Sequence, residues 1–266
     1  MTLILQRPTG SKLTLRQTWQ PMDPDAAAYI TAVETADGQA LEEKVKIAID
    51  NFVLGCKSDG IWDAIKASCI LAGARTLSGA LVPLKGTAPT SFGFVVADYN
   101  RETGLVGTPL TSYLDSGLDM QDVPADSIHQ SVYVTSAGTN TASYIGGVYL
   151  NNGGYLTDIQ RTSTSLGFRN RKVTGFIATG NQNSTGFLGT SRGDSTQFEY
   201  RLNGSTGTQA ATLGNAHNGD FSVFRRTNNL TTDARLSFYS IGENLDLALL
   251  DNRVSTLMTD IGAAIP

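Results

Sequence analysis

The spacing of hydrophobic residues is helical in the first part of the chain. Asp23-Pro24 offers an N-cap and an N1 proline, which predicts a first helix from Ala26 to Thr35 that ends at Gly38. Two further apolar stripes at helical spacing follow, the first formed by Leu41, Val45, Ala48, Ile49, Phe52, Val53 and Cys56 and the second by Ile61, Trp62, Ile65, Cys69 and Ile70. We therefore expect a helical module over residues 21–78.

A short strand-like segment precedes these helices. Leu3-Ile4-Leu5 and Leu13-Thr14-Leu15 flank the turn-rich Pro8-Thr9-Gly10-Ser11, so residues 1–20 are expected to form a β-hairpin. An isolated hairpin is marginally stable in water, which makes this one a candidate attachment segment.

Near Gly79 the period of the pattern changes to two. Residues 79–243 break into short alternating runs, for which we predict strands at residues 92–96, 128–134, 143–150, 155–160, 166–169, 174–178, 186–189, 197–202, 208–213, 221–225 and 234–240. Asn151-Asn152-Gly153-Gly154 joins two of them as a hairpin turn. The fold class expected is mainly β, an antiparallel sandwich of the jelly-roll type.

The chain returns to helical spacing over residues 244–266. Asn244 is a candidate cap, and Leu250, Val254, Leu257 and Ile261 share one helical face. This face either packs on the protein's own sheet and N-terminal helices or forms a subunit interface.

Composition argues against several classes of partner. Only 17% of the 266 residues are charged and the formal net charge is -4, which offers no broad basic face to nucleic acid. The two cysteines, Cys56 and Cys69, occupy apolar helical positions and imply no disulfide framework. No apolar run is long enough for a membrane span or a signal peptide, so we expect a chain made in the cytoplasm without a cleaved export signal.

Catalytic equipment is sparse. Gly189-Thr190-Ser191-Arg192-Gly193 matches a nucleophile elbow, but a strand rather than a helix is predicted after it, so we interpret it as a hairpin turn. His129 and His217 are the two available bases, and Glu199 and Asp220 are available carboxylates for a glycan-processing enzyme. Arg192-Gly193-Asp194, an adhesion tripeptide at a predicted loop tip, is explained by turn chemistry. We expect no enzyme activity and no cofactor.

Two groups of residues are candidates for ligand binding. Asp115, Asp119, Asp122 and Asp126 fall between predicted strands; a solvated acidic loop is the preferred interpretation and a Ca²⁺ site the alternative. Around the predicted hairpin lie the candidate ligand-surface residues Tyr144, Tyr149, Asn151, Asn152 and Tyr155, because aromatic faces and amides suit a sugar surface. Alternating tyrosines on a strand are also typical of a core.

Several segments of the chain form a recognisable series. They are Tyr99-Asn100-Arg101-Glu102-Thr103-Gly104-Leu105-Val106-Gly107, then Ser112 to Gly117, then His129-Gln130-Ser131-Val132-Tyr133-Val134, together with the block Asp59 to Leu84 and the ending Phe238 to Asp251. This series resembles structural proteins of tailed bacteriophages. The resemblance implies a concanavalin A-like (laminin-G-like) jelly roll on a phage particle, held to the virion by its N-terminal part. It carries over no functional site.

The function expected from this resemblance is that of a non-enzymatic virion structural protein, assembled in the host cytoplasm. A tail fibre or receptor-binding component is the preferred version, with other virion proteins and a host surface glycan as partners and a homotrimer as the oligomer. A capsid decoration or head-fibre protein and a carbohydrate-active enzyme are the alternatives.

Overall fold

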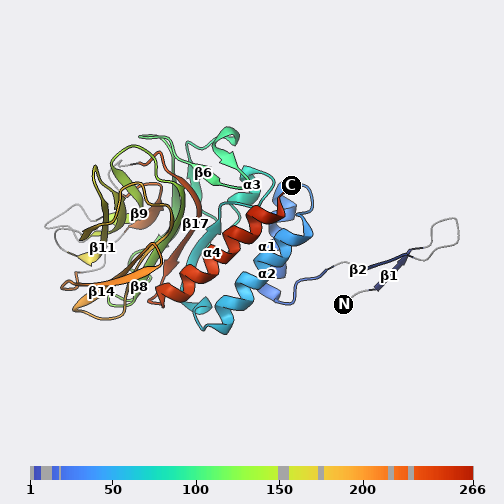
Figure 1. Ribbon diagram of the computed structural model, residues 1–266, viewed down its shortest axis with the longest axis horizontal. Coiled ribbons are helices and arrows are strands. Elements are labelled where there is room, and N and C mark those ends of the chain that lie inside the picture. Colours follow the sequence, from blue (N-terminus) through green and yellow to red (C-terminus); the bar gives the residue numbers. More distant parts are fainter. Residues whose placement is uncertain are drawn as a thin grey trace.

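Two antiparallel sheets pack face to face, and helices cover the outer face of the larger one (Figure 1). The computed structural model describes residues 3–6, 14–17, 19–148, 156–172, 177–214, 219–226 and 231–265. The larger sheet has the strand order β15 (Ser205–Ala210), β14 (Gln197–Leu202), β13 (Gly186–Arg192), β8 (Ile128–Ser136), β17 (Arg235–Gly242), β6 (Gly104–Val106) and β5 (Tyr99–Asn100), and β3 (Ile65–Ile70) also pairs with β17.

The smaller sheet completes the sandwich. Its order is β12 (Ile177–Thr179), β11 (Leu166–Lys172), β10 (Leu156–Arg161), β9 (Ala142–Val148), β16 (Asp220–Val223), β7 (Tyr113–Asp119) and β4 (Thr90–Phe92). Alternation along each strand divides the side chains between layers: Val132 and Val134 of β8 pack between the sheets, whereas Tyr133 packs against the helices. The predicted fold class, a mainly β antiparallel sandwich with helices at both ends of the chain, is confirmed.

The helical layer consists of α1 (Pro24–Asp37), α2 (Glu43–Ser58) and α4 (Leu247–Ala264), with the short α3 (Leu77–Ala80) beside them. Asp23 caps α1 as predicted, since its carboxylate accepts from the backbone N–H of Asp25 and Ala26, and Gly38 ends the helix in the left-handed conformation. The cap of α4 is Asp246, not Asn244. The apolar face of α4 is buried against α2 and the sheet, so the prediction that it packs on its own core is confirmed.

The predicted third helix is wrong. Trp62–Ala64 form a single 3₁₀ turn (η1), and the following residues are strand β3, which lies within the range assigned to the helical module but belongs to the larger sheet. Cys69 faces the second sheet while Ile70 faces the helices, and both are buried. A strand covered on both faces reads as a nearly continuous apolar run, which periodicity does not separate from a buried helix.

The segment from Tyr99 to Gly107 connects the helical layer to the larger sheet through hydrogen bonds. Arg101 donates to both carboxylate oxygens of Glu42, at 3.1 and 2.7 Å, and its Nε donates to the carbonyl of Ala74 at 3.0 Å. The Tyr99 hydroxyl donates to the same carbonyl at 2.7 Å. Asn100 accepts from the backbone N–H of Glu102 and Thr103 and so fixes the turn between β5 and β6. These residues couple the helical layer to the sandwich.

The N-terminal hairpin is present, and Figure 1 shows it projecting away from the rest of the chain. Strands β1 (Leu3–Gln6) and β2 (Thr14–Gln17) pair antiparallel with Leu5 opposite Leu15. Within the residues described, no helix is long and apolar enough to cross a membrane. Both cysteines are free and buried.

Candidate functional site

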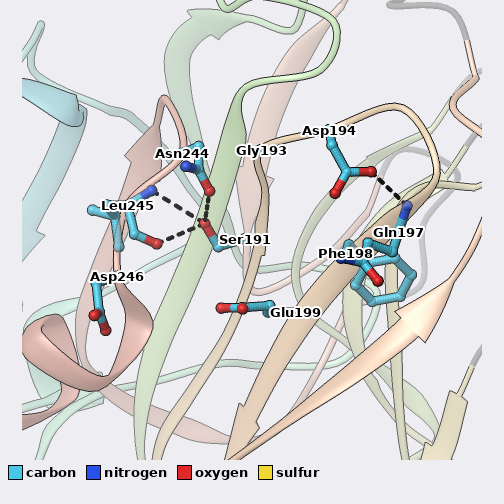
Figure 2. A pocket seen from close by; sticks show the side chains of 9 residues that line it. All are labelled: Ser191, Gly193, Asp194, Gln197, Phe198, Glu199, Asn244, Leu245 and Asp246. Carbon is cyan, nitrogen blue, oxygen red and sulfur yellow. Dashed lines mark hydrogen bonds between the residues drawn. The ribbon is translucent and has the colours of Figure 1, made fainter.

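A polar pocket of about 340 Å³ lies where β13, β14 and the start of α4 meet (Figure 2). It contains the Ser191 of the elbow-like motif and three carboxylates, and we call it the Ser191 pocket. Its lining residues are Ser191, Gly193, Asp194, Gln197, Phe198, Glu199, Asn244, Leu245 and Asp246. The sequence analysis named Ser191 and Glu199 as separate candidates. Strand β13 pairs with β14 so that Ser191 lies opposite Glu199, and this pairing places both in one site.

Ser191 is a structural link in this pocket. Its side chain is buried, and its Oγ lies 2.7 Å from Asn244 Oδ1 and 2.8 Å from the Leu245 carbonyl, while the Leu245 N–H donates to it at 3.1 Å (Figure 2). The predicted hairpin at this motif is present, since β13 pairs antiparallel with β14. Its turn begins later than expected, however, because Thr190, Ser191 and Arg192 continue strand β13. A nucleophile elbow needs an exposed hydroxyl on a sharp turn into a helix, and Ser191 has neither.

The RGD tripeptide is likewise unable to act as an adhesion motif. The Arg192 side chain is fully buried and donates to the carbonyls of Asn170, Asp194 and Ala211. Its guanidinium is therefore held inside the sandwich and is not presented at a loop tip.

His129 is the partner of Ser191 on the neighbouring strand, but its ring nitrogens bond to other groups and it does not act as a base for Ser191. Its Nδ1 lies 2.5 Å from the Glu243 carbonyl, and its Nε2 lies 2.6 Å from Ser240 Oγ. A carbonyl oxygen only accepts, so Nδ1 carries the proton and Nε2 accepts from Ser240. Burial lowers the pKa of His129 from 6.5 to about 4. His217, the other predicted base, lies outside the described residues.

The buried His129 makes stability depend on pH. The pKa of His129 is lower in the folded chain than in the unfolded chain. The unfolded chain therefore protonates this residue below pH 6.5, whereas the folded chain protonates it only near pH 4. Stability is thus complete above pH 6.5 and falls through that window. We expect urea unfolding to show a loss of about 1 kcal/mol between pH 7.5 and 5.5. His129→Gln should remove this slope; an unchanged slope in the variant would contradict the assignment.

Two of the three carboxylates in the Ser191 pocket have local structural partners. Asp194 accepts from the backbone N–H of Thr196 at 2.6 Å and of Gln197 at 2.9 Å, and these bonds lower its pKa. Asp246 caps α4. Glu199 is exposed. A glycosidase needs a general acid with a raised pKa beside a second carboxylate, and the lowered pKa of Asp194 is the reverse of that. The pocket is instead suited to accept hydrogen bonds from a hydroxyl-rich ligand.

The predicted ligand surface around the Asn151 hairpin receives a correction at Tyr144. This side chain is fully buried between the sheets, and its hydroxyl donates to the Ala137 carbonyl at 3.0 Å, so it belongs to the core. The alternative interpretation, that alternating tyrosines on a strand are typical of a core, is therefore the one that holds at Tyr144. Tyr149, Asn151, Asn152 and Tyr155 lie outside the described residues.

The acidic segment is not a loop throughout. Asp115 and Asp119 lie on strand β7, opposite Ser222 and Asp220 of β16. Burial and the neighbouring Asp115 carboxylate raise the pKa of Asp220. Over the described ranges, no group of three or more His, Cys, Asp or Glu side chains is arranged to hold a metal ion.

The face of the smaller sheet turned away from the sandwich carries groups that sequence reasoning missed. Phe92 of β4 stacks on Tyr113 of β7 with ring centroids 4.4 Å apart, and the Arg225 guanidinium lies 3.1 Å from the Tyr113 centroid. Further across, the fully buried Asp158 accepts from Arg169, Arg226 and Ser143. These groupings depend on which residues lie opposite one another on neighbouring strands. The sequence does not show this register, because turns and bulges between the strands shift it.

No known family profile matches the chain, and no curated protein matches it by sequence. Solved structures do. The binding domain of botulinum neurotoxin DC in complex with SialylT has a TM-score of 0.50 at 11% identity, over 75% of this chain and 51% of that one. The botulinum neurotoxin serotype D binding domain has 0.49 at 12%, over 73% and 51%.

Trypanosoma rangeli sialidase in complex with sialic acid has a TM-score of 0.49 at 10% identity, over 75% of this chain and 34% of the sialidase. The chain thus spans 51% of the toxin domains and 34% of the enzyme. At these identities the likeness to the neurotoxin DC binding domain concerns fold alone: the chain has a β-sandwich fold of that kind.

Proposed function

We propose that this chain is a non-enzymatic structural protein of a tailed-bacteriophage particle, a tail fibre or receptor-binding component attached through its N-terminal part. The observation that carries the proposal is the layout in Figure 1, where a two-stranded hairpin projects from a body of helices and sandwich. Phe187 and Phe238 of the larger sheet share one core with the helices, so the body is a single packed unit. The segment 99–107 resembles phage structural proteins, and this resemblance is the reason for proposing a phage particle.

The state of the catalytic candidates supports a non-enzymatic role. Ser191 and His129 are buried with their polar atoms bonded to structural partners, and Asp194 and Asp246 hold a turn and a helix end. These four groups are explained by the architecture around them.

A host surface glycan is the ligand we propose for the body. The Ser191 pocket is lined by carboxylates and amides that accept and donate hydrogen bonds to hydroxyl groups. An open polar pocket of this kind gives weak binding, which a homotrimer would strengthen through avidity.

Antibody labelling of purified particles tests the proposed function. An antibody raised against the folded full-length chain should decorate the tail or its fibres. Label on the head would favour the decoration alternative over a receptor-binding role. Absence of label, together with absence of the chain from the particle's protein bands, would overturn the proposal.

A further inference from the structure

Exposed apolar side chains gather on one short stretch of the chain. Among the described residues, six large hydrophobic side chains are exposed, and four of them are Phe92 (39%), Val95 (59%), Val96 (78%) and Leu110 (82%). Phe92 pairs with Tyr113, and the Gly93 backbone lies against Thr111, so the two ends of this stretch are neighbours in space. We call these four residues the β4 patch. Apolar groups gathered in this way mark a surface that contacts another molecule.

Leu110 adds an independent sign. Its φ of 64° lies in the left-handed region, which is unfavourable for a residue with a Cβ. Its backbone N–H donates to Thr231 Oγ1, which holds this conformation. A strained backbone that presents an exposed leucine is unfavourable for the isolated chain, and such strain is typical of a functional contact.

Strand β4 is also an open edge. It is the last strand of the smaller sheet, and its three residues are all exposed. An uncovered edge strand offers unpaired backbone N–H and C=O groups to any extended segment. The β4 patch lies directly beside this edge, so strand addition would bury both together.

The same chain supplies a segment of matching chemistry. Hairpin β1–β2 projects from the body, and three consecutive residues of β1, Leu3 to Leu5, are apolar, with Leu15 of β2 opposite Leu5. Residues 1–20 contain three basic residues and no acidic one, whereas the rest of the chain has 17 basic and 24 acidic residues.

The face beside β4 is the acidic counterpart of this hairpin. Asp115 of β7 pairs with Thr90 of β4, and Asp119, further along β7, pairs with Asp220 of β16. Arg225, a basic residue on this face, is held by its contact with the Tyr113 ring. Opposite charge steers association and fixes orientation, which favours the basic hairpin as the occupant.

We propose that the β4 edge binds the N-terminal hairpin of a second copy of this chain. The hairpin extends the smaller sheet, and its basic composition complements the aspartates of β7 and β16. Donor and acceptor surfaces differ, so the contact is head to tail, and the homotrimer of the proposed function is the closed ring that we propose for it. The inference rests on the homotrimer of the proposed function and names the contact that forms it. Measurements on the purified chain test it separately from any role on a particle.

Light scattering of the purified full-length chain over a range of concentrations tests the inference. The wild-type chain should form an oligomer of defined mass, and Leu110→Gly should weaken self-association at least tenfold. Because glycine favours a positive φ, this variant should keep or raise its melting temperature, which separates lost assembly from lost folding. The triple variant Arg7→Glu, Lys12→Glu, Arg16→Glu should also dissociate, whereas Lys44→Glu, at an exposed position of α2, should not.

A chain that stays monomeric at every concentration would overturn the inference, as would an oligomer unaffected by Leu110→Gly or by the triple variant. Cysteine pairing gives a second readout. Cys56 and Cys69 are buried, and burial raises the pKa of each to about 12, so they do not compete with introduced thiols. Ser91→Cys combined with Leu5→Cys or Leu15→Cys should give a disulfide between chains; Ser91→Cys with Lys44→Cys should not.

Discussion

Gly104→Ala is expected to destabilise the sandwich by roughly 3–5 kcal/mol, from the sum of a left-handed backbone penalty and overpacking. Gly104 has a φ of 93°, and a Cβ at this position would lie 2.1 Å from the carbonyl oxygen of Leu236. That oxygen belongs to the backbone of β17, a central strand, so relief of the clash requires movement of the strand itself. Urea unfolding followed by circular dichroism measures the loss.

Two other glycines provide matched comparisons. Gly107→Ala should also be strongly destabilising, since its Cβ would lie 2.1 Å from the Thr232 carbonyl. Gly262→Ala is the control, because nothing lies within 4 Å of that position on α4 and alanine favours a helix by about 0.5–1 kcal/mol. Equal unfolding midpoints for Gly104→Ala and Gly262→Ala would contradict the backbone contact.

Asp158→Asn is expected to lower the free energy of unfolding by about 3–5 kcal/mol, the usual effect of removing one partner from a buried ion pair. The Asp158 carboxylate is fully buried and accepts from Arg169 Nε at 2.6 Å, from Arg226 Nη1 at 3.2 Å and from Ser143 Oγ at 3.0 Å. The substitution keeps the size of the side chain but leaves both guanidinium groups without their carboxylate. Chemical denaturation at pH 7 measures the change.

Glu243→Gln is the control for this substitution. Its carboxylate pairs with Lys66 at 2.9 Å, but both side chains are more than a third exposed, so solvent screens the pair and the expected effect is below about 1 kcal/mol. Similar losses for the two variants would show that Asp158 is solvated rather than held in a buried network.

The parts of the fold that depend on local chemistry were predictable. The Asp23 cap and the Gly38 ending of α1 follow from backbone groups within a few residues. Strand β3 was not predictable, because helices cover one of its faces and a sheet covers the other, which erases the alternation that marks a strand. Asp246, rather than Asn244, caps α4 because Asn244 Oδ1 lies beside Ser191 Oγ, a contact between residues 53 apart.

The candidate sites show the same limit. Residues 92–96 were predicted as one strand, but β4 ends at Phe92 and a 3₁₀ turn (η2, Val96–Asp98) follows, which exposes Val95 and Val96. Hydrophobicity alone predicts burial of such residues and does not reveal a patch. The Ser191 pocket depends on the pairing of β13 with β14 and on the position of α4, and neither is encoded within a local window of sequence.

The central claim is our proposal that this chain is a receptor-binding component of a phage particle. It is tested most directly by deleting the coding segment from a phage that carries it and measuring particle adsorption to host cells. A receptor-binding virion component predicts that particles still form but fail to adsorb, and that full-length chain supplied in trans restores adsorption. Particles that lack the chain and adsorb at the normal rate would contradict the account.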